Sequence, residues 1–215
     1  MPIKFFYGSG SPPAWRVWLA LEYKGLAYDL RVLSFDAGDT RRADFLEVNP
    51  RGRVPAIVDG EFALYEANAI IEYLEEQYPA TRQLFPGTTR DRARVRRWIS
   101  EIDDDCVRTI HDLGSAVSAA KKHGDDAGIA AARQAVLKEL MLVAGLMQGD
   151  YLAGGGPSAA DFALYPSLAL LARYAGRNAE LGLVEACPQR LRDWMARIEA
   201  LPFLAATVPP HWKAR

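Results

Sequence analysis

Residues 49–60, NPRGRVPAIVDG, and residues 64–74, LYEANAIIEYL, decide the fold that we expect for this chain. The pair Asp59-Gly60 separates two short apolar runs, which is a strong short-range signal for a β-hairpin. The second run leads into a helical pattern that begins at Glu66. A hairpin followed directly by a helix is therefore the framework around which the neighbouring residues are placed.

This framework also predicts a binding site. Pro55 stands at the head of the hairpin and can take the cis form, which exposes the backbone of Val54 as an edge for a peptide. The helix start at Glu66 offers free N–H groups and the positive end of the helix dipole to a carboxylate. Together these features predict a socket for a small anionic peptide.

The residues upstream predict a strand, a helix and a second strand. Prolines stand in the first turn of this helix, and Gly25 is its stop signal. Residues 36–48 are polar and irregular, with room for a short helix. The complete order is that of a thioredoxin-like layer. The expected elements are strands at 3–8, 27–34, 55–58 and 62–65 and helices at 12–24 and 66–78.

The composition changes after Pro79, and residues 80–88 are typical of a linker. Beyond them, apolar residues recur at spacings of three and four, which indicates helices. Ser158 to Asp161 form a capping box that opens an apolar helix, and Pro166 inside that helix should kink it. One long helix carries Val95, Trp98, Ile99, Ile102, Cys106, Ile110 and Leu113, and further helices are expected at 127–147 and between Pro188 and Pro202.

Composition argues against several classes of protein. The 215 residues can form one large or two small domains, and half of them are hydrophobic, so we expect a globular chain. With 26 Lys and Arg against 27 Asp and Glu, the chain lacks the clustered cationic excess that nucleic acid requires. No signal peptide or run of transmembrane length is seen, so we expect no membrane partner. Two cysteines without a Cys-x-x-Cys pattern favour a reduced, cytoplasmic protein.

Residues 11–17, SPPAWRV, resemble the first-helix signature of the serine-type cytosolic glutathione transferases. The spacing from Ser11 to Arg16 resembles the zeta class most, within a zeta- and theta-like group. The box from Ser158 to Asp161 resembles the buried helix cap of the family's C-terminal domain. These pieces, in their order and spacing, extend the resemblance over almost the whole chain.

The resemblance implies an α/β thioredoxin-like N-terminal domain at 1–79, a linker at 80–88 and an all-α domain at 89–215. It also implies a homodimer and glutathione as co-substrate. We expect no metal, because three adjacent acids at 103–105 cannot share one helical face. Nor do the histidines form a ligand spacing; they are His111, His123 and His211.

Ser11 is the expected sulfur donor. A thiol with a pKa near ~8.5 is only a few per cent thiolate at neutral pH. A hydroxyl beside a helix N-terminus lowers that pKa by hydrogen-bonding the anion in a positive dipole field. Ser11 precedes the first helix and is placed to do so, with Ser9 and Tyr7 as fallbacks. The alternative is that Ser11 is only the N-cap of a helix that begins with Pro12.

The resemblance assigns the glutathione contacts residue by residue. Val54 matches the residue whose backbone pairs with the cysteinyl part, and Pro55 matches the cis-proline. Glu66 matches the residue that contacts the γ-glutamyl end, and Ala67 follows it at the helix start. Arg53, or as the less favoured alternative Arg51, could meet the glycyl carboxylate.

Two departures from the family pattern stand out. Ala67 occupies a position that is usually serine, so a hydroxyl worth roughly 1.5–3 kcal/mol to a bound carboxylate is missing; Asn68 could compensate. Pro12 and Pro13 remove two backbone N–H groups near the sulfur. They also stand where the zeta pattern has a serine and a cysteine, which puts maleylacetoacetate isomerase activity in doubt.

The second substrate pocket is less well defined by the sequence. In related dimers an acidic residue of the long helix reaches the partner's γ-glutamyl ammonium, and Asp104 is our choice for it. Cys106, Thr109 and the tail residue Trp212 could line the electrophile pocket, although Cys106 could equally be an ordinary buried residue.

We therefore expect an enzyme, a glutathione transferase that joins the glutathione thiolate to an apolar electrophile. One alternative is a binding or scaffold protein of the same fold with weak or no catalysis, which Ala67 and the two prolines favour. A second alternative is a glutathione-dependent disulfide reductase or peroxidase that uses the same thiolate.

Overall fold

The computed structural model describes residues 1–123 and 126–213 of the chain. The chain forms two compact units, residues 1–86 with 201–215, and residues 87–200. The predicted domain boundaries at 79 and 88 stay a prediction, and the last residues of the predicted 89–215 domain, like residues 124–125, lie outside the described part.

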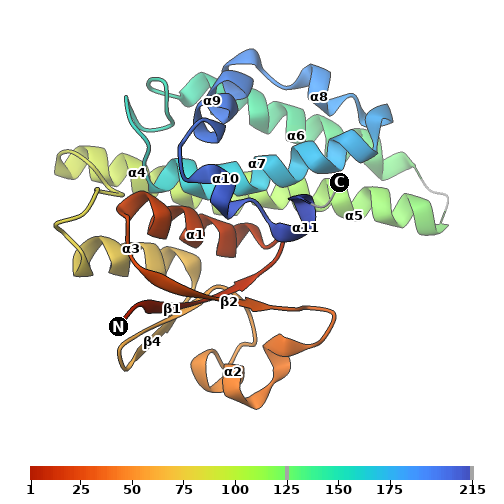
Figure 1. The fold of residues 1–215 in the computed structure, drawn as a ribbon. Coiled ribbons are helices and arrows are strands. Elements are labelled where there is room, and N and C mark those ends of the chain that lie inside the picture. Colours follow the sequence, from red (N-terminus) through yellow and green to blue (C-terminus); the bar gives the residue numbers. More distant parts are fainter. Residues whose placement is uncertain (124–125, 214–215) are drawn as a thin grey trace. The chain divides into compact units, whose positions relative to one another are not determined.

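The first unit is built on a four-stranded mixed sheet with the order β2-β1-β3-β4. β1 and β2 are parallel, with Ile3 opposite Tyr28, and β3 is antiparallel to both β1 and β4. Figure 1 shows α1 and α3 on one face of this sheet and α2 on the other. The elements are β1 Ile3–Gly8, α1 Pro12–Lys24, β2 Tyr28–Leu33, a 3-10 turn Asp39–Arg41, α2 Ala43–Val48, β3 Ala56–Asp59, β4 Phe62–Tyr65, α3 Ala67–Gln77, α10 Leu204–Thr207 and α11 Pro210–Lys213.

The prediction of a thioredoxin-like layer is confirmed, and α1 has the predicted bounds. Ser11 caps α1, prolines occupy its first two positions, and Gly25 ends it in the left-handed conformation with φ 69°. Proline suits the first turn because its missing N–H has no helical partner there, and glycine adopts positive φ without a steric cost. The local residues thus fix both ends of this helix.

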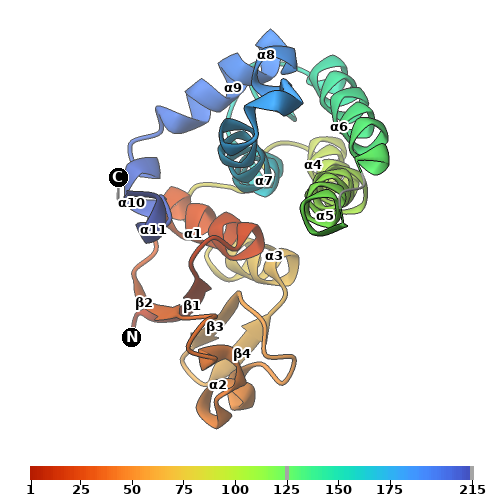
Figure 2. The same ribbon diagram turned by 90° about the vertical axis from the view of Figure 1, so that its right-hand side faces the viewer.

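In its described residues the second unit has helices as its regular secondary structure, as predicted. α5 packs along α6, α4 contacts α7, and α8 and α9 pack against α6 and α7 (Figure 2). Residues 89–123 form one helical path, but a π-helical turn that the sequence did not predict interrupts it. The elements are α4 Thr89–Glu101, the π turn Ile102–Cys106, α5 Val107–His123, α6 Ala127–Leu146, α7 Ala159–Arg177, a 3-10 turn Ala179–Leu181, α8 Leu183–Ala186 and α9 Gln189–Glu199.

The capping box at the start of α7 is confirmed. The fully buried carboxylate of Asp161 accepts hydrogen bonds from both the N–H and the hydroxyl of Ser158, each at 2.9 Å. It also accepts from the N–H of Leu152 at 3.0 Å and the indole N–H of Trp194 at 2.8 Å. A buried carboxylate requires such partners, because an unsatisfied one would be very costly.

A buried ion pair fixes residues 82–85 to the first unit. The Nζ of Lys24 lies 3.1 Å from Oε2 of Glu75 and also donates to the carbonyl of Arg82. The same carboxylate accepts from the backbone N–H groups of Leu84 and Phe85. Burial alone would raise the pKa of Glu75, but these N–H groups and the Lys24 ammonium together lower it.

We predict that Glu75→Gln lowers the free energy of unfolding at neutral pH by about 3–5 kcal/mol, because it leaves the Lys24 ammonium buried without its counter-charge. Since the pKa is lower in the fold than in the unfolded chain, this stabilisation is complete above about pH 4.3 and is lost as the pH falls through the folded value. Urea unfolding of both proteins across this range measures the difference.

The matched control is Glu101→Gln, which breaks the exposed pair between Arg97 and Glu101. It should cost at most about 1 kcal/mol, because solvent screens such pairs. Equal losses for the two variants would contradict a stabilising role for the buried pair.

Candidate functional site

A tight turn joins β1 to α1 and carries the expected sulfur donor. The N–H of Ser11 donates to the carbonyl of Gly8 at 3.1 Å, which closes a four-residue turn. Gly10, the third residue of this turn, has φ 86°, as a type II turn requires. Ser9 and Ser11 therefore flank Gly10 in a rigid connection.

The backbone N–H groups at the start of α1 are absent or already used. Pro12 and Pro13 have none, the N–H of Ala14 donates to Oγ of Ser11 at 3.4 Å, and the N–H of Trp15 donates to the carbonyl of Ser11. Because Ser11 accepts with its oxygen, its hydroxyl hydrogen stays available. In the described first turn of α1, this hydrogen is the donor that remains for an anion.

The two fallback donors are in different surroundings. Tyr7 is fully buried against Trp18, with ring centroids 4.9 Å apart. Burial raises the pKa of Tyr7 despite opposing hydrogen bonds from Gly10 and Ser9, so its phenol is a weak acid. Ser9 Oγ lies 2.6 Å from Nδ1 of His211.

His211 is the residue near this turn that the sequence analysis did not connect to it. A Cβ on Gly10 would lie 3.0 Å from Cε1 of His211, so the ring rests against the turn. The adjacent Trp212 packs edge-on against Trp15 with ring centroids 5.3 Å apart. No sequence signal pointed to this contact, because 202 positions separate Ser9 from His211.

The loop before β3 lies beside the same turn. The Val54–Pro55 bond is cis, as predicted. A Cβ on Gly8 would lie 2.9 Å from Cγ2 of Val54, so the end of β1 and this loop touch. Within the described residues, neither backbone group of Val54 has a hydrogen-bond partner. Arg53 is exposed at the surface.

Asn49 stabilises this loop through its side chain, a role that the sequence did not indicate. It is buried, its Nδ2 donates to the carbonyl of Arg53 at 2.6 Å, and its Oδ1 accepts from the N–H of Arg51 at 3.0 Å. Gly52 has φ 60°, and a Cβ there would lie 2.8 Å from the carbonyl oxygen of Thr40. The loop thus requires glycine at this position, and Asn49 holds its shape.

The start of α3 has an unusual backbone. Glu66 precedes the helix with φ 72° and ψ 117°, a conformation that costs of order 1–3 kcal/mol and is found most often at functional sites. No side chain caps the helix. Ala67 is buried, and Oδ1 of Asn68 accepts from Nη1 of Arg16 at 2.8 Å, so α1 holds this amide oxygen.

The remaining predicted site residues belong to the second unit, apart from Trp212. Asp104 is exposed on the π turn. Cys106 is buried, its thiol donates to Oε1 of Glu139 at 3.1 Å, and the hydroxyl of Thr109 donates to its carbonyl at 3.0 Å. Burial and the Glu139 carboxylate raise the pKa of Cys106. Asp104, Cys106 and Thr109 therefore share one short helical segment.

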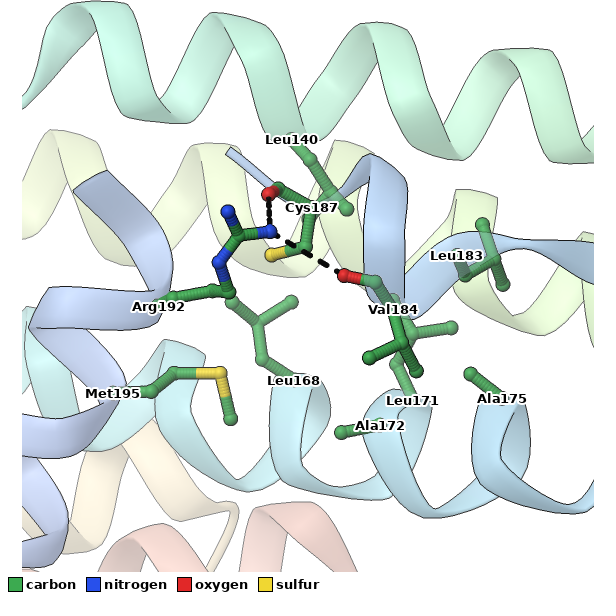
Figure 3. A pocket seen from close by; sticks show the side chains of 10 residues that line it. All are labelled: Leu140, Leu168, Leu171, Ala172, Ala175, Leu183, Val184, Cys187, Arg192 and Met195. Carbon is green, nitrogen blue, oxygen red and sulfur yellow. Dashed lines mark hydrogen bonds between the residues drawn. The ribbon is translucent and has the colours of Figure 1, made fainter. Parts of the chain in front are cut away.

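An apolar cavity of about 110 Å³ lies within the second unit (Figure 3). At its rim, Nη1 of Arg192 donates to the carbonyls of Val184 and Cys187. Burial raises the pKa of Cys187, although Arg192 opposes the shift. The cavity therefore presents a neutral thiol and no free nucleophile. Its lining residues are Leu140, Leu168, Leu171, Ala172, Ala175, Leu183, Val184, Cys187, Arg192 and Met195.

In the part of the chain that the structure describes, no three His, Cys, Asp or Glu side chains gather where they could hold a metal ion. None of the helices in the described ranges combines the length and the apolar character that crossing a membrane requires.

Comparisons with known proteins point to one family. Residues 10–77 match the family described as "Glutathione S-transferase, N-terminal domain", and residues 126–197 match "Glutathione S-transferase, C-terminal domain". Glutathione S-transferase A of Pleuronectes platessa is 30% identical over 96% of this chain and 91% of its own. A probable maleylacetoacetate isomerase of Vibrio cholerae is 30% identical over 94% of this chain and 93% of its own.

A solved structure shares the fold over the full length. The glutathione S-transferase of the Antarctic clam Laternula elliptica superimposes with a TM-score of 0.86 at 29% identity. The match covers 100% of this chain and 95% of that structure. This fold therefore also occurs in a solved glutathione S-transferase.

We predict that both cysteines of this chain alkylate more slowly than a free thiol. Their pKa values are raised, so less thiolate exists at neutral pH, and thiolate is the reactive form. Iodoacetamide labelling of the folded protein, followed by peptide mass analysis, gives the rate at Cys106 and Cys187 beside N-acetylcysteine as reference. A rate at Cys187 equal to that of the reference would contradict the prediction.

Proposed function

Because the chain belongs to the glutathione S-transferase family, we propose that it transfers the thiolate sulfur of glutathione to a small apolar electrophile. The observation that carries this proposal is the free hydroxyl hydrogen of Ser11 at the start of α1, where Pro12 and Pro13 supply no N–H group. A charged sulfur accepting from this hydroxyl would be favoured over the neutral thiol.

The first unit offers candidate partners for the rest of glutathione. The unpartnered backbone of Val54 would pair with the cysteinyl part. The uncapped start of α3, at Glu66 and Ala67, would receive the γ-glutamyl carboxylate. Arg53 would meet the glycyl carboxylate. The contact between Gly8 and Val54 supports one continuous site, because it makes the turn at residues 8–11 a neighbour of the Val54 backbone.

The same proposal includes a pocket for the electrophile and a homodimer. Cys106, Thr109 and Trp212 would line the electrophile pocket, and Asp104 would reach the glutathione of the second subunit in a homodimer. The protein would act in the cytoplasm. Because the Cys106 thiol donates to Glu139, it would line this pocket without reacting with the electrophile.

A second candidate is a glutathione-transferase-like binding protein with weak or no catalysis. The missing hydroxyl at Ala67 and the missing N–H groups at Pro12 and Pro13 favour it. A disulfide reductase or peroxidase would use the same thiolate and the same donor. We do not propose isomerisation of maleylacetoacetate, because proline stands at 13 where the zeta pattern has cysteine.

Calorimetric titration with glutathione, followed by an assay with a generic electrophile, separates these candidates. The transferase requires a measurable dissociation constant and glutathione-dependent product. Dissociation constants of millimolar or weaker without product would favour the binding protein, and turnover of a disulfide or peroxide alone would favour the third candidate.

We predict that Ser11→Ala lowers the conjugation rate by roughly 10- to 100-fold near neutral pH, because a hydrogen bond to a charged group is worth about 1.5–3 kcal/mol. Ser11 also caps α1, so thermal melting must accompany the rate measurement. Ser11→Thr, which keeps hydroxyl and cap, is the control and should retain most activity. Unchanged activity in the alanine variant would transfer the role to Ser9 or Tyr7.

We predict that Ala67→Ser raises the affinity for glutathione by roughly 5- to 100-fold, because it adds a charge-assisted hydrogen bond where Asn68 Oδ1 is held by Arg16. Ala69→Ser, an exposed position of the same helical turn, is the matched control and should change affinity little. Calorimetry measures all three proteins. Weaker binding by Ala67→Ser would mean that the carboxylate does not sit at this helix start.

A further inference from the structure

The C-terminal tail places an imidazole next to the sulfur turn. Nδ1 of His211 and Oγ of Ser9 are 2.6 Å apart, and the ring edge rests against Gly10. Two contacts hold the tail on α1: Trp212 against Trp15, and the Trp15 indole N–H donating to Thr207 Oγ1 at 2.9 Å. His211 is thus anchored at the turn that also carries Ser11.

The hydroxyl–imidazole contact can exist in two proton arrangements. With neutral His211 unprotonated at Nδ1, the hydroxyl of Ser9 donates to the ring. With protonated His211, Nδ1–H donates to the oxygen of Ser9, and the hydroxyl hydrogen of Ser9 is released for another acceptor. When the ring gains a proton, the Ser9 hydroxyl therefore stops donating to the ring and can donate to another group instead.

We propose that His211, acting through Ser9, receives the thiol proton of glutathione and holds it while the sulfur is an anion. This inference rests on the function proposed above. The S–H bond breaks and its proton bonds to the Ser9 oxygen, while the former Ser9 hydroxyl proton bonds to Nδ1 of His211. The products are a thiolate, an intact Ser9 hydroxyl that now donates to the sulfur, and an imidazolium, with no change in total charge.

The turn geometry makes a shared sulfur feasible. Ser9 and Ser11 are separated only by Gly10 in a turn closed by the Gly8–Ser11 hydrogen bond, and the proposal places one acceptor between their two hydroxyls. Two prolines have removed the N–H groups that would otherwise stabilise the thiolate. The imidazolium supplies the missing positive charge, and a paired imidazolium lowers the pKa of a thiol.

The groups that face His211 favour this role. Ser9 and Gly10 contact it from the turn, and the ring centroids of His211 and Trp212 are 6.1 Å apart. Ser9 is also a hydrogen-bond partner of the buried Tyr7 phenol. In the described part of the chain, no carboxylate or cationic side chain pairs with His211. A free thiol is only a few per cent thiolate at neutral pH, so an imidazole at this turn would act where the thiol needs help to ionise.

The test compares His211→Gln with the wild type over a range of pH. Glutamine keeps a polar partner for Ser9 but cannot take up a proton. We expect kcat/KM to fall about tenfold near pH 6.5, as for a thiol pKa raised by about one unit, and less than about twofold near pH 9, where hydroxide ionises the thiol. The ultraviolet absorbance of enzyme-bound thiolate should titrate at correspondingly higher pH, and KM for glutathione should change less than about twofold.

A purely structural role would lower the rate by the same factor at every pH, and that result would overturn the inference. His111→Gln, an exposed histidine of the second unit, is the matched control and should follow the wild-type profile. Ser9→Ala should reproduce the His211→Gln profile, and the double variant should be no worse than either single one. Additive losses would also overturn the inference.

The outcomes separate this inference from the proposed function. A wild type that binds and conjugates glutathione while His211→Gln shares its pH profile refutes the role of His211 alone. A wild type that neither binds glutathione nor forms product refutes the proposed function, and the inference with it.

Discussion

At the start of α1, two consecutive prolines leave a helix N-terminus with almost no backbone donors. The few that remain are used: Ala14 donates to the Ser11 side chain and Trp15 to the Ser11 carbonyl. A helix N-terminus normally attracts an anion through its free N–H groups. Here the candidate donors are side-chain hydrogens, that of Ser11 and, in our proposal, that of Ser9 beside His211.

The loop before β3, at the other end of the candidate site, is held by buried polar contacts. Asn49 fixes the backbone of residues 51–53, and Gly52 allows the chain to pass close to Thr40. This support presents Val54 beside the end of β1. The strained backbone of Glu66 then starts α3 without a side-chain cap. Such a conformation persists only where the surrounding structure enforces it, and the helix that follows Glu66 packs against α1, β3 and β4.

In the second unit, too, buried polar groups are held by hydrogen bonds. Asp161 is buried with four donors around it and therefore fixes the start of α7. Cys106 and Cys187 are kept as thiols by burial. The hydrogen bonds of Asp161 stabilise the helical unit, and burial makes both of its thiols less reactive.

The sequence by itself determined the elements whose signals are local. Ser11, the prolines after it and Gly25 fixed the ends of α1, Asp59-Gly60 fixed the hairpin, and Ser158 with Asp161 fixed the start of α7. Cap and turn preferences act over about three to five residues, so a single sequence displays them. The cis form of the Val54–Pro55 bond was also predicted, from its place at the head of the hairpin and its match to the family.

Only the tertiary structure decided which distant side chains meet. The pairs Ser9 with His211, Arg16 with Asn68, and Lys24 with Glu75 are 202, 52 and 51 positions apart. None of them follows from periodicity or capping, because long-range contacts depend on how whole elements pack. Tyr7 was left as a possible sulfur donor by the sequence, and its complete burial against Trp18 emerged only in the packed unit. The candidate sulfur site was therefore predictable up to Ser11, whereas the imidazole beside it required the folded tail.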